Sequence, residues 1–75
     1  MIKAVIGNNV KRETKILDET TKLRKALEDA GVDYTRGSVT LDGATLAPGD
    51  LDKTFAQHGI TEKCFLLQVV KADNA

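Results

Sequence analysis

One amphipathic helix pattern stands alone in this chain, and it limits the folds available. Leu23, Ala26, Leu27 and Ala30 fall at offsets 0, 3, 4 and 7, which places them on one face of a helix spanning residues 21–30. Asp18 or Thr20 can cap its N-terminus, and Gly31 stands where a left-handed C-cap is wanted. A lone helix in a 75-residue chain must bury its apolar stripe against something else, and the rest of the sequence offers strands.

Two strand patterns precede the helix. Residues 1–6 send Ile2, Ala4 and Ile6 to one face and Val5 to the other, if Lys3 lies in water. Residues 7–9 form a turn of glycine and asparagine. Residues 10–17 alternate less cleanly, and we expect Thr14 and Ile16 to face the core. A strand so rich in charge suits the edge of a sheet, where lysines discourage pairing with another chain.

Three further strand patterns follow the helix. Residues 38–46 indicate a hairpin around Asp42-Gly43, a strong signal for a tight turn. Pro48-Gly49 is a second turn, and Asp50 can cap a short helical segment, residues 51–57, that buries Leu51 and Phe55. The last strand spans residues 64–70. Its even-numbered residues form one face and its odd-numbered residues the other, and we expect Leu66 and Val70 to face outward.

The predicted element order is strand-strand-helix-strand-strand-short helix-strand, a mixed four- to five-stranded sheet packed on one helix. We assign this α+β domain to residues 1–70 and a short tail to residues 71–75.

Eleven basic and eleven acidic residues cancel, so no net field attracts nucleic acid or an anionic membrane. A single cysteine rules out an internal disulfide and indicates a reducing compartment. With no signal peptide or membrane span expected, the predicted location is cytoplasmic.

This layout resembles the ubiquitin-like β-grasp superfamily, including its small bacterial members. The resemblance rests on VTLDGATL (residues 39–46) and on Leu51, Gly59-Ile60-Thr61-Glu62-Lys63 and Phe65-Leu66-Leu67, and it covers residues 1–70. Family members that are conjugated, or that carry sulfur, end in Gly-Gly, since only glycine tolerates the close approach of the activating enzyme. Here the last residues are Asn74-Ala75. The resemblance therefore implies a binding module more than a carrier.

The sequence gives little support for a catalytic, metal-binding or nucleic-acid-binding site. Cys64 and His58 are the only side chains of their kind, and neither a catalytic pair nor a zinc site follows from two such residues. A ferredoxin cluster would need four cysteines. Tyr34 beside Arg36 is a poor platform for stacking nucleic-acid bases. We expect no enzyme activity, cofactor, metal, nucleic acid or membrane partner.

The open face of the sheet is the predicted partner surface, because ubiquitin-like proteins use this face. Thr40 stands where the resemblance places a central isoleucine, and it departs from that pattern. Outward apolar residues on neighbouring strands favour an interface. The predicted partner-binding residues are Val5, Thr40, Leu66, Gln68 and Val70.

Three functions remain open. The first is a non-covalent interaction module, a small adaptor or regulatory subunit that binds a protein partner. The second is a ubiquitin-like modifier or sulfur carrier activated at its C-terminus. The third is self-association into a weak homodimer, through the strand Val39–Leu41 or through the open face; otherwise the chain is a monomer.

Overall fold

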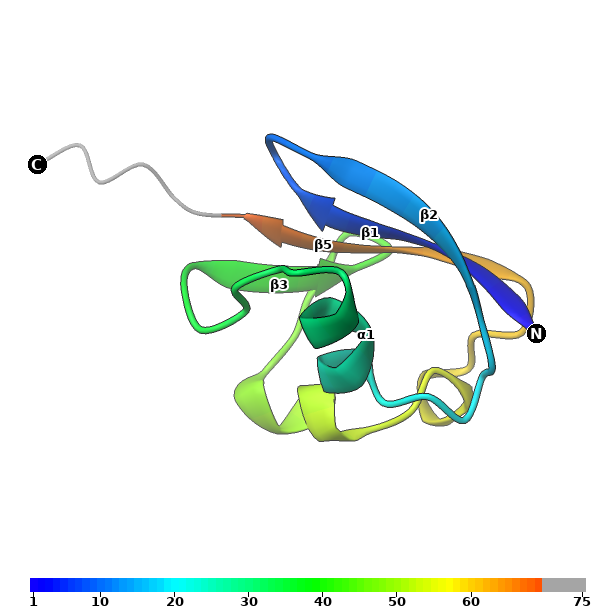
Figure 1. The fold of residues 1–75 in the computed structure, drawn as a ribbon. Coiled ribbons are helices and arrows are strands. Elements are labelled where there is room, and N and C mark those ends of the chain that lie inside the picture. The colour runs from blue at the N-terminus through cyan, green and yellow to red at the C-terminus, as the bar shows by residue number, and fades with distance from the viewer. Residues whose placement is uncertain (70–75) are drawn as a thin grey trace, which may run out of the picture.

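A computed structural model describes residues 1–69 as one sheet with one helix packed against it (Figure 1). The sheet has five strands, and two short 3₁₀ segments, η1 and η2, follow the fourth of them. In chain order the elements are β1 (Ile2–Asn8), β2 (Arg12–Leu17), α1 (Leu23–Asp29), β3 (Ser38–Leu41), β4 (Ala44–Thr45), η1 (Pro48–Asp52), η2 (Ala56–His58) and β5 (Lys63–Val69). The predicted order of elements is confirmed, with the short helical region divided into two segments.

The strands lie in the order β2-β1-β5-β3-β4, so the two terminal strands are central neighbours. β1 and β5 run parallel, whereas β1–β2, β3–β4 and β3–β5 are antiparallel. The sheet is therefore mixed, as predicted. The β3–β4 hairpin turns at Asp42 and Gly43, which both have positive φ (52° and 89°), the pair of values that a tight primed turn requires.

The helix buries three of the four residues of the predicted stripe, but it begins two residues later and ends one residue earlier than the predicted span of residues 21–30. Leu23, Ala26 and Leu27 are fully buried, and Gly31 follows the helix with φ 73°. Its N-cap is Lys22, which makes no side-chain capping bond. The prediction that Asp18 or Thr20 caps this helix is wrong, because the Asp18 carboxylate accepts the backbone N–H and the hydroxyl of Thr20 and closes a turn that precedes it.

The core lies between α1 and one face of the sheet, and α1 covers that face in Figure 1. Phe55, from the segment between η1 and η2, is completely buried there, as is Leu66 of β5. Leu51 of η1 is also buried, so the predicted anchors of the short helical region are confirmed. The other core residues are Ile2, Ala4, Ile6, Leu23, Ala26, Leu27, Val32, Val39, Leu41 and Cys64.

The predicted orientation of β5 is wrong. The parallel register places Cys64 beside Ala4 and Leu66 beside Ile6, and neighbours in a sheet point to the same face. Because Ala4 and Ile6 line the core, Leu66 is 0% exposed, and Gln68 is only 3% exposed. The alternate residues of β5 face outward instead, with Phe65 46% and Val69 44% exposed.

The predicted orientation of β2 is also wrong. Ile16 lies opposite Lys3, on the face away from the helix, and is 60% exposed. Thr14 is exposed opposite Val5 on that same face. The inner face of β2 instead carries Glu13, Lys15 and the half-buried Leu17, because the hairpin with β1 aligns Leu17 with Ile2. A one-residue shift of register reverses every side chain of a strand, and that shift is what separates the prediction from the structure.

Candidate protein-interaction face

The face of the sheet that α1 leaves uncovered, called the open face below, has an apolar centre. Val5 and Phe65 are direct neighbours on β1 and β5, and Thr40 of β3 lies opposite Leu67. Ile16 of β2 and Val69 of β5 extend the apolar surface to either side. The apolar residues of the open face are Val5, Ile16, Phe65, Leu67 and Val69.

Threonines lie beside these apolar residues on β2, β3 and β4. Thr14 stands opposite Val5, and Thr40 is paired with Thr45 on β4. The Thr40 hydroxyl donates a hydrogen bond to the carbonyl oxygen of Leu67 at 3.4 Å. Thr40 is half-buried. The methyl group of threonine keeps this surface partly apolar while its hydroxyl is bonded within the sheet.

The charged residues of the open face share one sign. Its strand positions in the described part of the chain include Lys3 of β1, Arg12 of β2 and Lys63 of β5, and no acidic residue. Lys3 and Lys63 are neighbours in the parallel register, and Arg12 lies opposite Gly7. The apolar centre is therefore bordered by cations, although the whole chain has no net charge.

The structure changes the set of predicted interaction residues. Val5 and Thr40 lie on the open face, as predicted. Leu66 and Gln68 do not, because both are buried on the opposite face. Val70 lies outside the described residues. The sequence prediction missed Ile16, Phe65, Leu67 and Val69, along with the three cations. The alternation of β5 groups Phe65, Leu67 and Val69 on one face, but it does not show which face of the strand is buried.

Gln68 has a structural role instead. Its side-chain amide donates to the backbone carbonyl of Arg36, in the segment that leads into β3. A buried amide needs such a partner, because an unpaired polar group inside a protein is costly. The residue therefore ties β5 to the segment between α1 and β3 and is not available to a partner.

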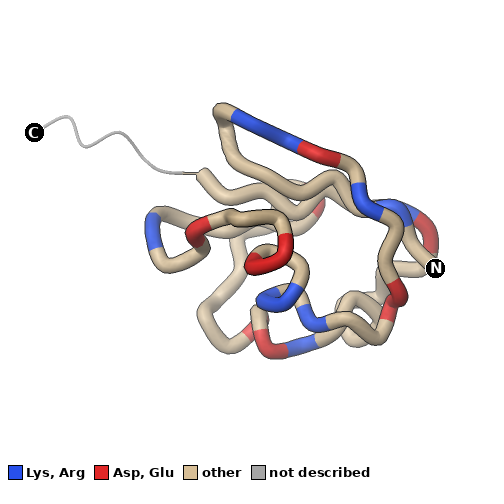
Figure 2. The backbone as a smooth tube through the Cα atoms, in the orientation of Figure 1, with Lys and Arg blue, Asp and Glu red and all other residues tan. Residues whose placement is uncertain are grey.

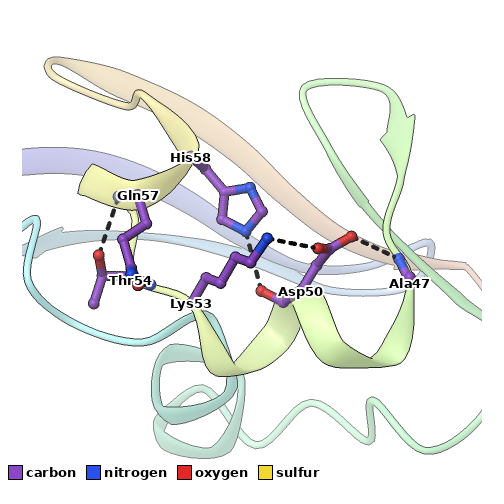
Figure 3. A network of polar contacts seen from close by, with 6 residues as sticks. All are labelled: Ala47, Asp50, Lys53, Thr54, Gln57 and His58. Carbon is purple, nitrogen blue, oxygen red and sulfur yellow. Dashed lines mark hydrogen bonds and ion pairs between the residues drawn. The ribbon is translucent and has the colours of Figure 1, made fainter.

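Cys64 and His58 have separate surroundings: Cys64 is buried in the core, and His58 bonds to Asp50. Cys64 is 2% exposed inside the core, and burial there, with a smaller effect of Asp42, raises the pKa of its thiol to about 11. His58 donates from Nε2 to the carbonyl oxygen of Asp50 at 3.0 Å (Figure 3). Within residues 1–69 no three histidine, cysteine or acidic side chains gather to hold a metal ion.

Asp50 organises the polar network of Figure 3. Its carboxylate accepts the backbone N–H of Ala47 at 3.0 Å and pairs with the Lys53 ammonium at 3.5 Å. The hydrogen bond from Ala47 is the main reason that the pKa of Asp50 is lowered. Thr54 and Gln57 exchange two further bonds between side chains and backbone N–H groups. All these contacts close turns within the chain, so the network is structural.

A groove of ≈ 380 Å³ lies on the other side of the molecule, with Val39, Leu46 and Leu51 in its lining. Arg24 at this groove pairs with Asp52 at 3.0 Å, and its guanidinium lies 5.7 Å from the centre of the Tyr34 ring. The Tyr34 hydroxyl in turn donates to Glu28 at 2.7 Å. The Arg24 and Tyr34 side chains are thus engaged by carboxylates of the chain itself, although the buried Nε of Arg24 has no hydrogen-bond partner from the residues that the structure describes. We therefore rank this groove below the open face as a candidate site.

No helix among the described residues is long and apolar enough to cross a membrane.

Comparison with known proteins identifies the fold. No protein-family model matches the chain, and no curated protein matches it either. Among solved structures, the ubiquitin-like domain of an Arabidopsis thaliana protein, determined by NMR, superposes with a TM-score of 0.71. The match covers 99% of this chain and 81% of that domain at 19% sequence identity. At 19% identity, this similarity supports the fold alone. The chain therefore has an α+β β-grasp fold of the ubiquitin-like type.

Proposed function

We propose that the chain is a non-covalent interaction module, without enzyme activity, that binds a protein partner through its open face. The observation that carries this proposal is the set of exposed and half-buried apolar side chains across β2, β1 and β5, with the exposed Phe65 at its centre. Aromatic side chains often provide a large share of the binding energy at protein interfaces. An adaptor or a regulatory subunit of a larger complex would have a surface of this kind.

The charges of the open face indicate the chemistry of the partner. Lys3, Arg12 and Lys63 border the apolar centre, so a partner with an apolar projection and acidic residues around it would be complementary. Such a border contributes to the rate and specificity of association more than to affinity, and salt screens it. Binding should therefore weaken as ionic strength rises, mainly through slower association.

The test is affinity purification of the tagged chain from its host, with matched variants. Phe65→Arg places a charge in the apolar centre, whereas Ala56→Arg adds the same side chain at an exposed position of η2, outside the sheet. A partner retained by the wild type and by Ala56→Arg, and bound roughly tenfold or more weakly by Phe65→Arg, supports the proposal. A partner retained equally by all three proteins contradicts it.

The intact mass of the recovered chain distinguishes the alternative function. Covalent adducts formed at the chain's own C-terminus would support a modifier or carrier. An unmodified chain that co-purifies with a partner would favour the interaction module.

A further inference from the structure

The outer side of β2 is a strand edge with no pairing partner among residues 1–69, since β2 is the first strand in the sheet order. The direction of its backbone groups follows from the hairpin. The Asn8 N–H donates to the Lys11 carbonyl, and alternate residues of an antiparallel pair bond to each other. Glu13 and Lys15 therefore point their backbone groups toward β1. Arg12, Thr14 and Ile16 point theirs away from the sheet.

Three residues with outward backbone groups can pair with three such residues from another strand. In a second copy of β2 running antiparallel, with the two-fold axis at Thr14, Arg12 lies opposite Ile16 of the copy and Thr14 lies opposite Thr14. Each of these pairs exchanges both backbone hydrogen bonds. Between them, Glu13 of each chain faces Lys15 of the other.

The charges of β2 favour this register over the neighbouring registers of the same strand pair. Figure 2 shows an acidic segment between two basic segments along β2, and in the sequence Glu13 lies between Arg12 and Lys15. Moving the two-fold axis to Glu13 or to Lys15 sets that residue against its own copy, and moving it to Arg12 sets arginine against arginine. With the axis at Ile16, Arg12 and Thr14 would lie opposite residues beyond the end of β2 in the copy and would have no strand to pair with. Like charges that face each other across strands are destabilising, and opposite charges stabilise.

We propose that two copies of this chain associate through antiparallel pairing of their β2 edges, with Thr14 on the two-fold axis. The contact joins the two sheets into one and leaves the centre of both open faces, around Phe65, uncovered. Arg12 and Ile16 at the edge of the open face belong to both surfaces, but partner binding at Phe65 does not require the dimer. Because the contact is one short strand wide, association is weak and depends on protein concentration.

Other edges of the sheet are less suited to self-pairing. β3 is bonded to β5 on one side and to β4 on the other, so the predicted pairing of copies through Val39–Leu41 is excluded in this fold. β4 has only two residues. Lysine at an edge usually opposes pairing with other chains, but here each Lys15 meets a glutamate.

Sedimentation equilibrium over a range of concentrations up to the millimolar is the first measurement. The expected result is a mass rising toward twice 8.1 kDa as concentration increases. Glu13→Lys and Lys15→Glu each set like charges against each other in the dimer, so each variant alone should associate at least roughly tenfold more weakly. The double variant, with the two charges exchanged, should recover the wild-type association.

Mixing the two single variants is the decisive control. One variant then presents two lysines and the other two glutamates, so a one-to-one mixture should form a heterodimer although each protein alone is monomeric. Circular dichroism of each variant shows whether it is folded. A wild type that stays monomeric at millimolar concentration overturns the proposal, and so does a dimer that is insensitive to both substitutions.

Amide hydrogen exchange gives a second readout that does not depend on substitution. In the monomer the amides of Glu13 and Lys15 should be protected, while those of Arg12, Thr14 and Ile16 exchange quickly. At concentrations where the dimer forms, these three amides should become protected as well. Association that leaves them fast would mean that the copies meet elsewhere.

Discussion

Asp42 and Phe65 bind each other twice across the end of the β3–β5 pair. The Asp42 backbone N–H donates to the carbonyl oxygen of Phe65 at 2.8 Å, and the Asp42 carboxylate accepts the backbone N–H of Phe65 at 2.9 Å. The side chain of a turn residue thus replaces a strand backbone as the acceptor for Phe65. Because Phe65 is the centre of the open face, the β3–β4 turn fixes the backbone from which that face is built.

We expect Asp42→Ala to destabilise the fold by about 1–2 kcal/mol. Alanine removes the acceptor for Phe65, and it must adopt the positive φ of 52°, which asparagine and aspartate tolerate better. Asp42→Asn keeps both properties and should remain near the wild type. Urea unfolding of the three proteins tests this. An alanine variant as stable as the asparagine variant would show that the bond to Phe65 contributes little.

Leu66 and Phe65 are adjacent in sequence, and the structure assigns opposite consequences to their substitution. Leu66→Arg places a charge in the core beside Ile6 and should unfold the domain, whereas an outward-facing Leu66, as the sequence predicts, would tolerate this change. Phe65→Arg should leave the fold intact, because the side chain is 46% exposed. Circular dichroism and thermal melting of the two variants check this directly; a folded Leu66→Arg variant would contradict the assigned orientation of β5.

The elements of this fold could be predicted, because each has a local signal. The helix has its apolar stripe, and the β3–β4 hairpin has Asp42-Gly43. The face that each strand buries could not be predicted for β5, since Phe65 and Leu66 are equally apolar and both alternating sets look like a core. The deciding fact is the parallel register with β1, which sets Leu66 beside Ile6. That contact joins residues at opposite ends of the chain, so no local sequence pattern indicates it.

The residues of the open face could not be predicted for the same physical reason. Ile16 is a β-branched apolar residue that local reasoning places in the core, yet the hairpin aligns it with Lys3 and exposes it. Gln68 is a polar residue that local reasoning places on the surface, yet its amide donates to the Arg36 carbonyl, and this bond compensates for its burial. Tertiary pairing overrides residue preference at both positions.

Gly7 should be irreplaceable in the β1–β2 hairpin. A Cβ at this position would lie 2.1 Å from the Lys11 carbonyl oxygen and 2.6 Å from the Arg12 Cα, and both are backbone atoms that cannot rotate away. We expect Gly7→Ala to lower stability by about 1–3 kcal/mol, as overpacking typically does. Gly49→Ala is the matched control, because its Cβ would meet nothing within 4 Å. Thermal unfolding of both variants measures the contrast, and equal losses would contradict the close approach at Gly7.

The buried thiol of Cys64 should make the fold sensitive to alkaline pH. Burial, with a smaller effect of Asp42, raises the pKa of Cys64 from 9.0 to about 11 in the folded state. Below pH 9 the thiol is neutral whether the chain is folded or unfolded, so its contribution to stability is fully present there. As the pH rises from 9 to 11, the unfolded chain releases this proton first, and the free energy of unfolding falls.

Substituting the cysteine isolates this effect from other groups that titrate at high pH. Cys64→Ala costs packing at every pH, but it removes the thiol, so its stability should fall less steeply than that of the wild type between pH 9 and 11. Urea unfolding at several pH values gives the two slopes. Reaction of the native protein with a thiol reagent should likewise be slow at neutral pH, since the thiolate is the reactive form and the side chain is buried. Parallel stability curves for the two proteins, or rapid labelling of the folded chain, would contradict a buried neutral thiol at this position.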